Sequence, residues 1–111
     1  METDQTFHYD VEHLPDDIHG NKVTTVKCSG RLTSANSTTI KEVVKPLLAL
    51  GGRTIVDLGE VSFLDSSGLG ALVGLKVSAI NQGLCRLEFV NMTPRVLELL
   101  HITHLAQLLT S

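Results

Sequence analysis

After residue 30, segments with the pattern of strands alternate with segments with the pattern of helices, and this alternation limits the possible folds more than any other feature. Strands joined by helices are expected to pair in parallel through right-handed crossovers. The helical segments carry apolar residues at three- and four-residue spacing, and the strand segments are apolar runs bounded by turn residues. In chain order, we first predict a helix capped by Thr33 or Ser34 and ended by Gly51-Gly52, and then a buried strand at 54–58. A second helix is predicted from Ser66 or Ser67 to about Asn81, ended by Gly83, and a strand follows at 86–91. The chain then continues with a helix from Thr93-Pro94 and a helical segment beyond Thr103.

The N-terminal part of the chain has the pattern of a β-hairpin. Residues 7–14 alternate between apolar and polar side chains, which is typical of a half-buried strand. A turn signal follows, and then residues 22–29 are rich in β-branched side chains, with Gly30 closing this second strand. The predicted fold is therefore a single α/β domain over residues 1–111: a mixed β-sheet with an N-terminal hairpin followed by βα units, with the helices packed on the sheet. Residues 1–6 are expected to form a flexible tail.

Three side chains inside the predicted helices carry specific expectations. Pro46 lies within the first helical pattern, so that helix is expected to kink or split near Lys45. The apolar side of the second helix is expected to consist of Leu69, Leu72, Val73 and Ile80. Leu75 falls off this stripe and is expected to be exposed, whereas Lys76 is expected to pack its stem and extend its amine into water.

Composition argues against several functions. A net charge of −3, with three Phe, one Tyr and no Trp, does not fit a surface that grips nucleic acid. No stretch approaches the ~20 apolar residues of a membrane span, and the acidic start is unlike a secretory signal, so we expect a cytoplasmic protein without membrane insertion. Cys28 and Cys85 show no metal-ligand spacing and are expected to be buried, reduced thiols. The first twenty residues hold six carboxylates and no Lys or Arg, which indicates a solvated edge or, alternatively, a docking site for a basic partner.

The segment 61–70, Val-Ser-Phe-Leu-Asp-Ser-Ser-Gly-Leu-Gly, lies where the second predicted helix follows a strand. Free backbone N–H groups and the helix dipole favour negative charge at such a helix start. Asp65 or Ser66 is well suited to cap those N–H groups. From the residues alone, a capped helix whose glycines permit close packing accounts for the segment without any further function.

The same segment also resembles the signature of a known family. VSFLDSSGLGALVGL is similar to the signature of the STAS family, named for sulfate transporters and anti-sigma factor antagonists. Further matching features are Gly30-Arg31-Leu32, Ile55-Val56-Asp57-Leu58, and Phe89-Val90-Asn91 followed by Pro94. The resemblance to the bacterial anti-sigma factor antagonists implies that Ser66 is the phosphorylation site. It further implies a partner-binding surface formed by Thr33, Asp65, Ser67, Gly68 and Leu69.

The resemblance implies a partner-switching mechanism. The unphosphorylated antagonist would bind an anti-sigma factor that is also a serine kinase, which frees a sigma factor and so regulates transcription. The kinase would then phosphorylate Ser66, and a separate phosphatase would reverse this step. Two residues depart from the family pattern: Thr33 stands where an acidic residue is common, and His104 where a glycine is usual. The alternative within the family is a non-phosphorylated binding subunit of a transporter complex, either a lipid-transport ATPase or an anion transporter.

Catalytic interpretations find little support in the residues. Ser66 lacks the Gly-x-Ser-x-Gly elbow of a hydrolase, and the glycines around it do not have the spacing of a nucleotide-binding loop. His101 and His104 are spaced to share one helical face, but zinc would need two further ligands. We therefore expect no catalytic residue, no metal site and no cofactor.

Overall fold

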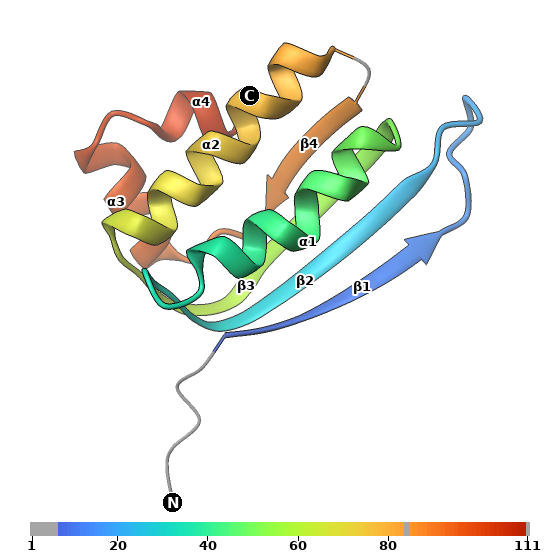
Figure 1. Cartoon of the computed structure of the whole chain (residues 1–111). Coiled ribbons are helices and arrows are strands. Elements are labelled where there is room, and N and C mark those ends of the chain that lie inside the picture. The colour runs from blue at the N-terminus through green and yellow to red at the C-terminus, as the bar shows by residue number, and fades with distance from the viewer. Residues whose placement is uncertain (1–6, 84, 111) are drawn as a thin grey trace, which may run out of the picture.

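Four strands form one mixed sheet in the order β1-β2-β3-β4, and the helices lie together over one of its faces (Figure 1). The computed structural model describes residues 7–83 and 85–110, so the predicted tail at 1–6 lies outside the described residues. The strands are β1 (His8–Leu14), β2 (Val23–Leu32), β3 (Gly52–Leu64) and β4 (Cys85–Val90). The helices are α1 (Ser37–Ala49), α2 (Ser66–Gln82), α3 (Pro94–Ile102) and α4 (Ala106–Thr110).

The pairing of the strands confirms the predicted α/β architecture. β1 and β2 pair in antiparallel fashion as the N-terminal hairpin, whereas β3 pairs in parallel with both β2 and β4. The parallel pairs require crossovers, which α1 and α2 supply on the same face of the sheet (Figure 1). This arrangement brings the carboxyl ends of β2, β3 and β4 to one end of the domain.

The two central strands are longer than predicted. β2 continues past Gly30, where it was expected to end, and β3 extends beyond both ends of the predicted 54–58 strand. The ladder between them shifts register twice, between Lys27 and Ser29 and between Gly30 and Arg31. Such irregularities interrupt the two-residue alternation of side chains, so the pattern in the sequence broke off before the strands did.

β1 is an edge strand, and its side chains are more exposed than the alternation predicts. Tyr9 and Val11 pair with Cys28 and Val26, so they face the side of the sheet that the helices cover. They are nevertheless 43% and 39% exposed. In Figure 1, β1 lies outside the area over which the helices stand, which explains why the strand was predicted correctly and its burial was not.

α1 runs unbroken through Pro46, so the predicted split of this helix near Lys45 is wrong. Pro46 lies on the exposed side, where water can reach the carbonyl group that loses its hydrogen-bond donor. Val44 and Leu48 flank the proline on the buried side and belong to the hydrophobic core. Core packing before and after Pro46 in the chain therefore stabilises the helix across the proline.

α2 is buried over a wider arc than a single apolar stripe predicts, because it packs against α1, α4 and β4. Leu75, which was expected to be exposed, is 1% exposed, whereas Ile80, expected in the stripe, is 59% exposed. The amine of Lys76 does not reach water as predicted. Its Nζ donates a hydrogen bond to the carbonyl oxygen of Leu87 at 2.7 Å, and burial lowers the pKa of this amine. Gly83 ends the helix in the left-handed conformation, with φ of 73°, as predicted.

The other face of the sheet carries charged side chains. Arg53 Nε and Nη2 donate to the carboxylate of Glu88 at 2.7 and 2.9 Å, and Arg86 Nε lies 3.1 Å from the same carboxylate. The hydrogen bonds from Arg53 hold the pKa of Glu88 below its usual value. Lys27 and Glu60 form a further ion pair at 3.8 Å. This face of the sheet is therefore polar and exposed to solvent.

The two cysteines differ in their surroundings. Cys28 is completely buried, and this burial raises the pKa of its thiol to about 12. Cys85 is only half-buried, so the predicted burial is confirmed for Cys28 and wrong in degree for Cys85. Both thiols are free, as expected.

α3 begins where the sequence predicted, at Thr93-Pro94. The hydroxyl of Thr93 accepts a hydrogen bond from the backbone N–H of Val96 at 3.3 Å, and Pro94 occupies the first turn. α3 ends before His104, whose φ of 61° is left-handed, so His101 and His104 do not share a helical face. Within the described part of the chain, no helix has both the length and the apolar character needed to cross a membrane.

Candidate functional site

Ser66 lies at the end of the domain where β3 passes into α2. A single residue, Asp65, separates the end of β3 from the first residue of α2. The side chains of Ser66 and Ser67 are exposed in the first turn of the helix. The hydroxyl of the predicted phosphoacceptor is therefore accessible to a second protein.

Asp65 joins the start of α2 to the loop between β2 and α1. Its Oδ1 accepts a hydrogen bond from the backbone N–H of Gly68 at 2.8 Å, which makes it the N-cap of α2, one of the two caps that the sequence allowed. Its Oδ2 accepts a second hydrogen bond, from the backbone N–H of Ser34 at 3.2 Å. No local sequence pattern signals this second bond, which spans 31 positions of the chain. It places the Thr33–Ser34 loop beside Ser66.

Gly68 allows α2 to approach the end of β2. A Cβ atom at this position would lie 2.9 Å from the carbonyl carbon of Leu32 and 2.9 Å from Cδ1 of Leu64, and closer still to the carbonyl oxygen of Leu32. Leu69 is also buried, with 6% of its surface exposed. Of the five residues expected to contact a partner, these two shape the site from inside the domain, and Thr33, Asp65 and Ser67 are left at its surface.

The loop before α1 is held by its own side chains. The backbone N–H of Thr33 donates to Oδ1 of Asn36 at 2.7 Å, and the hydroxyl of Thr33 accepts from the backbone N–H of Ala35 at 3.2 Å. Asn36 is the N-cap residue of α1, so the prediction that Thr33 or Ser34 caps this helix is wrong. The loop uses the oxygen of Thr33 to fix its own shape, where the family pattern would place a carboxylate.

The outer surface of α2 extends this site without charge. Lys76 is the single charged residue between Ser66 and Gln82, and it is buried. The exposed positions of the helix are small, amide or aliphatic: Ser66, Ser67, Gly70, Gly74, Val77, Ile80, Asn81 and Gln82. The sequence already shows that Lys76 is the single charged residue of this helix. That the exposed surface of the helix has no charge follows only from the burial of Lys76 in the structure.

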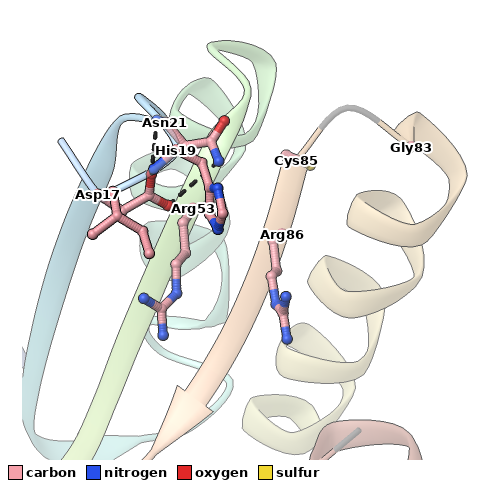
Figure 2. Close-up of a pocket in the computed structure, with 9 residues that line it drawn as sticks. Asp17, His19, Asn21, Arg53, Gly83, Cys85 and Arg86 are labelled. Carbon is pink, nitrogen blue, oxygen red and sulfur yellow. Dashed lines mark hydrogen bonds between the residues drawn. The ribbon is translucent and has the colours of Figure 1, made fainter.

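A hollow of about 540 Å³ lies at the opposite end of the sheet, where β3 and β4 begin. Figure 2 shows Arg53 and Arg86 side by side in it, with Asp17 reaching in from the loop between β1 and β2. The carboxylate of Asp17 accepts hydrogen bonds from the backbone N–H groups of Asn21 and His19 at 2.9 and 2.8 Å, which lower its pKa. The charged groups of this hollow are thus already paired within the protein, and none of its residues belongs to the Ser66 site.

The described residues, 7–83 and 85–110, contain no group of three or more His, Cys, Asp or Glu side chains placed to hold a metal ion. His101 and His104 are both exposed, and only His101 belongs to α3. At the Ser66 site, the structure presents the exposed Ser66 at a helix start that is capped by Asp65.

Comparisons with known proteins connect this site to a family. The family model for the STAS domain matches residues 14–110. The anti-sigma-B factor antagonist of Staphylococcus aureus (strain NCTC 8325) is 36% identical over 85 residues, which are 76% of this chain and 78% of the relative. The anti-sigma factor antagonist SpoIIAA in its unphosphorylated form has the same fold, with a TM-score of 0.69 at 19% identity over 90% of this chain and 84% of SpoIIAA.

A domain of a much larger protein is also similar. The murine anion transporter Slc26a9 matches with a TM-score of 0.61 at 28% identity, over 74% of this chain but only 13% of the transporter. The match of the family model over nearly the whole chain and the identity to the staphylococcal relative lead to one conclusion. The chain belongs to the STAS domain family.

Proposed function

We propose that this protein is an anti-sigma factor antagonist that binds an anti-sigma factor through the surface around Ser66 and is released when Ser66 is phosphorylated. The observation that carries the proposal is the exposed Ser66 hydroxyl at the start of a helix whose outer surface has no charge. The staphylococcal relative, named an anti-sigma-B factor antagonist, supports the binding role. SpoIIAA, whose structures are described for an unphosphorylated and a phosphorylated form, supports control by phosphate.

The physical basis of release is a change of charge on the docking surface. A phosphoryl group adds a charge of about −1.5 to −2 and three acceptor oxygens. At the N-terminus of α2 the helix dipole tolerates this charge, so the domain stays folded. A partner packed on the uncharged surface of α2 would have to remove water from the phosphate. Each ~1.4 kcal/mol of this penalty weakens binding tenfold.

In this mechanism Ser66 is an acceptor and not a catalyst. The anti-sigma factor, acting as a serine kinase, would transfer the γ-phosphoryl group of ATP to Oγ of Ser66, release ADP and take up the hydroxyl proton. A phosphatase would hydrolyse the phosphoserine and restore the binding form. The protein itself contributes the position of the hydroxyl, which Asp65 fixes through its hydrogen bonds to Gly68 and Ser34. Such a cycle depends on ATP and on soluble partners, so we place it in the cytoplasm.

Affinity capture from native cells tests the proposal. The wild-type protein and the Ser66→Ala variant should retain an anti-sigma factor with a kinase fold, and the Ser66→Asp variant should lose it. Ile18 offers a matched control, because it is 94% exposed in the loop between β1 and β2, at the opposite end of the sheet, so Ile18→Asp adds one negative charge away from the site and should leave capture unchanged. Mass spectrometry of the recovered wild-type protein should find phosphate on Ser66 and not on Ser67. Equal capture by wild type and Ser66→Asp would overturn the proposal.

The transporter-subunit alternative has one supporting observation, which is the likeness to a domain of the murine anion transporter. In that case the same experiment has a different outcome. An ATP-binding or membrane transporter subunit would be retained equally by wild type and by Ser66→Asp, and Ser66 would carry no phosphate.

A further inference from the structure

An apolar hollow of about 220 Å³ lies between the end of β3 and α3. Its walls are mainly Phe63 and Leu64 from β3 and Val96, Leu99 and Ile102 from α3. Figure 1 shows α3 at the same end of the domain as the start of α2. Pockets for drug-sized ligands usually span about 300–1,000 Å³, so this hollow suits a single inserted side chain better than a small-molecule ligand.

The hollow and the Ser66 site share a wall. Leu64 lines the hollow, and its Cδ1 also faces Gly68 in the first turn of α2, at the position where a Cβ would come within 2.9 Å. Asp65 and Ser66 follow Leu64 directly in the chain. The hollow therefore lies next to the start of α2, within reach of a protein docked on Ser66.

The hollow leaves apolar surface open to water. Ile102 is 68% exposed at the C-terminal end of α3, although it lines the hollow. An exposed aliphatic residue is ordinary by itself, but here it borders a concave surface formed by four other apolar side chains. Insertion of an apolar side chain would remove part of this apolar surface from water.

Two arginines lie at the rim of the hollow or against one of its walls. Arg95 and Glu98 lie at its edge, and the guanidinium of Arg31 stacks over the ring of Phe63, 4.3 Å from the ring centroid. Arg95 and Glu98 balance each other in formal charge, and Arg31, stacked on the Phe63 wall, brings the sum of the three to +1, in a chain whose net charge is −3. A carboxylate next to the inserted side chain would complement this rim.

We infer that this hollow, which we call the α3 hollow, receives an aliphatic or aromatic side chain of the anti-sigma factor, next to an acidic residue that pairs with Arg95 or Arg31. The inference rests on the proposed function, because it extends the same docking surface. The α3 hollow would then anchor the partner by burial, while Ser66 controls release through charge.

The experiment measures the dissociation constant between the anti-sigma factor captured by the wild-type protein and a set of purified variants. Ile102→Asp should weaken binding by at least about tenfold, because it places a charge in the α3 hollow. Arg95→Glu should also weaken binding, even though an acidic residue in the first turn of α3 favours the helix dipole and should not reduce thermal stability. Ile18 offers a matched control, since it is a 94% exposed isoleucine in the loop between β1 and β2, and Ile18→Asp should bind like wild type.

Two outcomes separate the inference from the function on which it rests. If Ile102→Asp and Arg95→Glu bind like wild type while Ser66→Asp does not, the α3 hollow is not part of the interface and the proposed function stands. If Ser66→Asp also binds like wild type, the proposed function is itself wrong. Circular dichroism and melting temperature of each variant show that any loss of binding comes from the surface and not from unfolding.

Discussion

Replacing Gly68 with alanine should destabilise the protein by about 2 kcal/mol, although alanine is the better helix former. The added Cβ would lie 2.9 Å from the carbonyl carbon of Leu32 and closer to its carbonyl oxygen, so the clash is with backbone at the end of β2. Overpacking costs about 1–3 kcal/mol, and a backbone neighbour that cannot rotate away places this clash near the upper value. The helix propensity of alanine returns about 1 kcal/mol, which leaves the net loss.

Gly74 provides the matched control within the same helix. Apart from the neighbouring backbone of α2 itself, no atom lies within 4 Å of the Cβ that alanine would add there, and the position is exposed. Gly74→Ala should therefore stabilise the protein by up to about 1 kcal/mol, because only the propensity gain remains. The same substitution, made six residues apart in α2, is thus expected to act with opposite signs.

Urea denaturation followed by circular dichroism measures the free energy of unfolding of both variants, and thermal denaturation measures their melting temperatures. For a domain of this size, 1 kcal/mol corresponds to roughly 4 °C in melting temperature, so Gly68→Ala should melt about 8 °C below wild type. Gly74→Ala should melt a few degrees above wild type. If the two variants had the same stability within about 0.5 kcal/mol, the close approach of α2 to β2 would be wrong.

Two further predictions concern stability. His104 adopts a left-handed φ of 61°, so His104→Gly should stabilise the protein by about 0.5–1 kcal/mol. His101→Gly, inside α3, should destabilise the protein by a similar amount. If urea denaturation showed that His104→Gly is less stable than wild type, this account of the final turn would be contradicted. The hydrogen bonds from Arg53 lower the pKa of Glu88, so this ion pair stabilises the fold above the unfolded-state pKa near 4.5 and loses its effect as the pH falls through the lower folded-state value. As the pH falls below 4.5, wild type should therefore lose more stability than Glu88→Gln, by up to the ~1 kcal/mol of a partly exposed ion pair, and parallel pH profiles of the two proteins would refute the role of the pair.

Most features that depend on neighbouring residues were predicted from the sequence, although the cap of α1 and the effect of Pro46 on that helix were not. The order of strands and helices follows from periodicity and turn residues. The start of α3 at Thr93-Pro94 and the cap of α2 by Asp65, one of its two candidate caps, were also predicted. The unusual residue at His104 was identified from the family pattern, and its left-handed φ explains why glycine is usual there.

Features that depend on contacts between distant segments were not predicted. The burial of Leu75 and Lys76 requires α1, α4 and β4 to surround α2, and no local pattern in α2 encodes those neighbours. The bond between Asp65 and Ser34, and the α3 hollow beside it, likewise depend on how β3 meets α1 and α3. The location of Ser66 at the start of a helix was therefore predictable from the sequence alone, whereas the surface that surrounds Ser66 was not.

The most direct test of the central claim compares the dissociation constants of the captured anti-sigma factor for the unmodified protein and for the same protein phosphorylated at Ser66. Circular dichroism of both forms should coincide, because the phosphate lies at an exposed helix N-terminus. The account predicts that phosphorylation weakens binding by at least tenfold, or about 1.4 kcal/mol. Equal dissociation constants for two folded forms, with phosphate verified on Ser66, would contradict it.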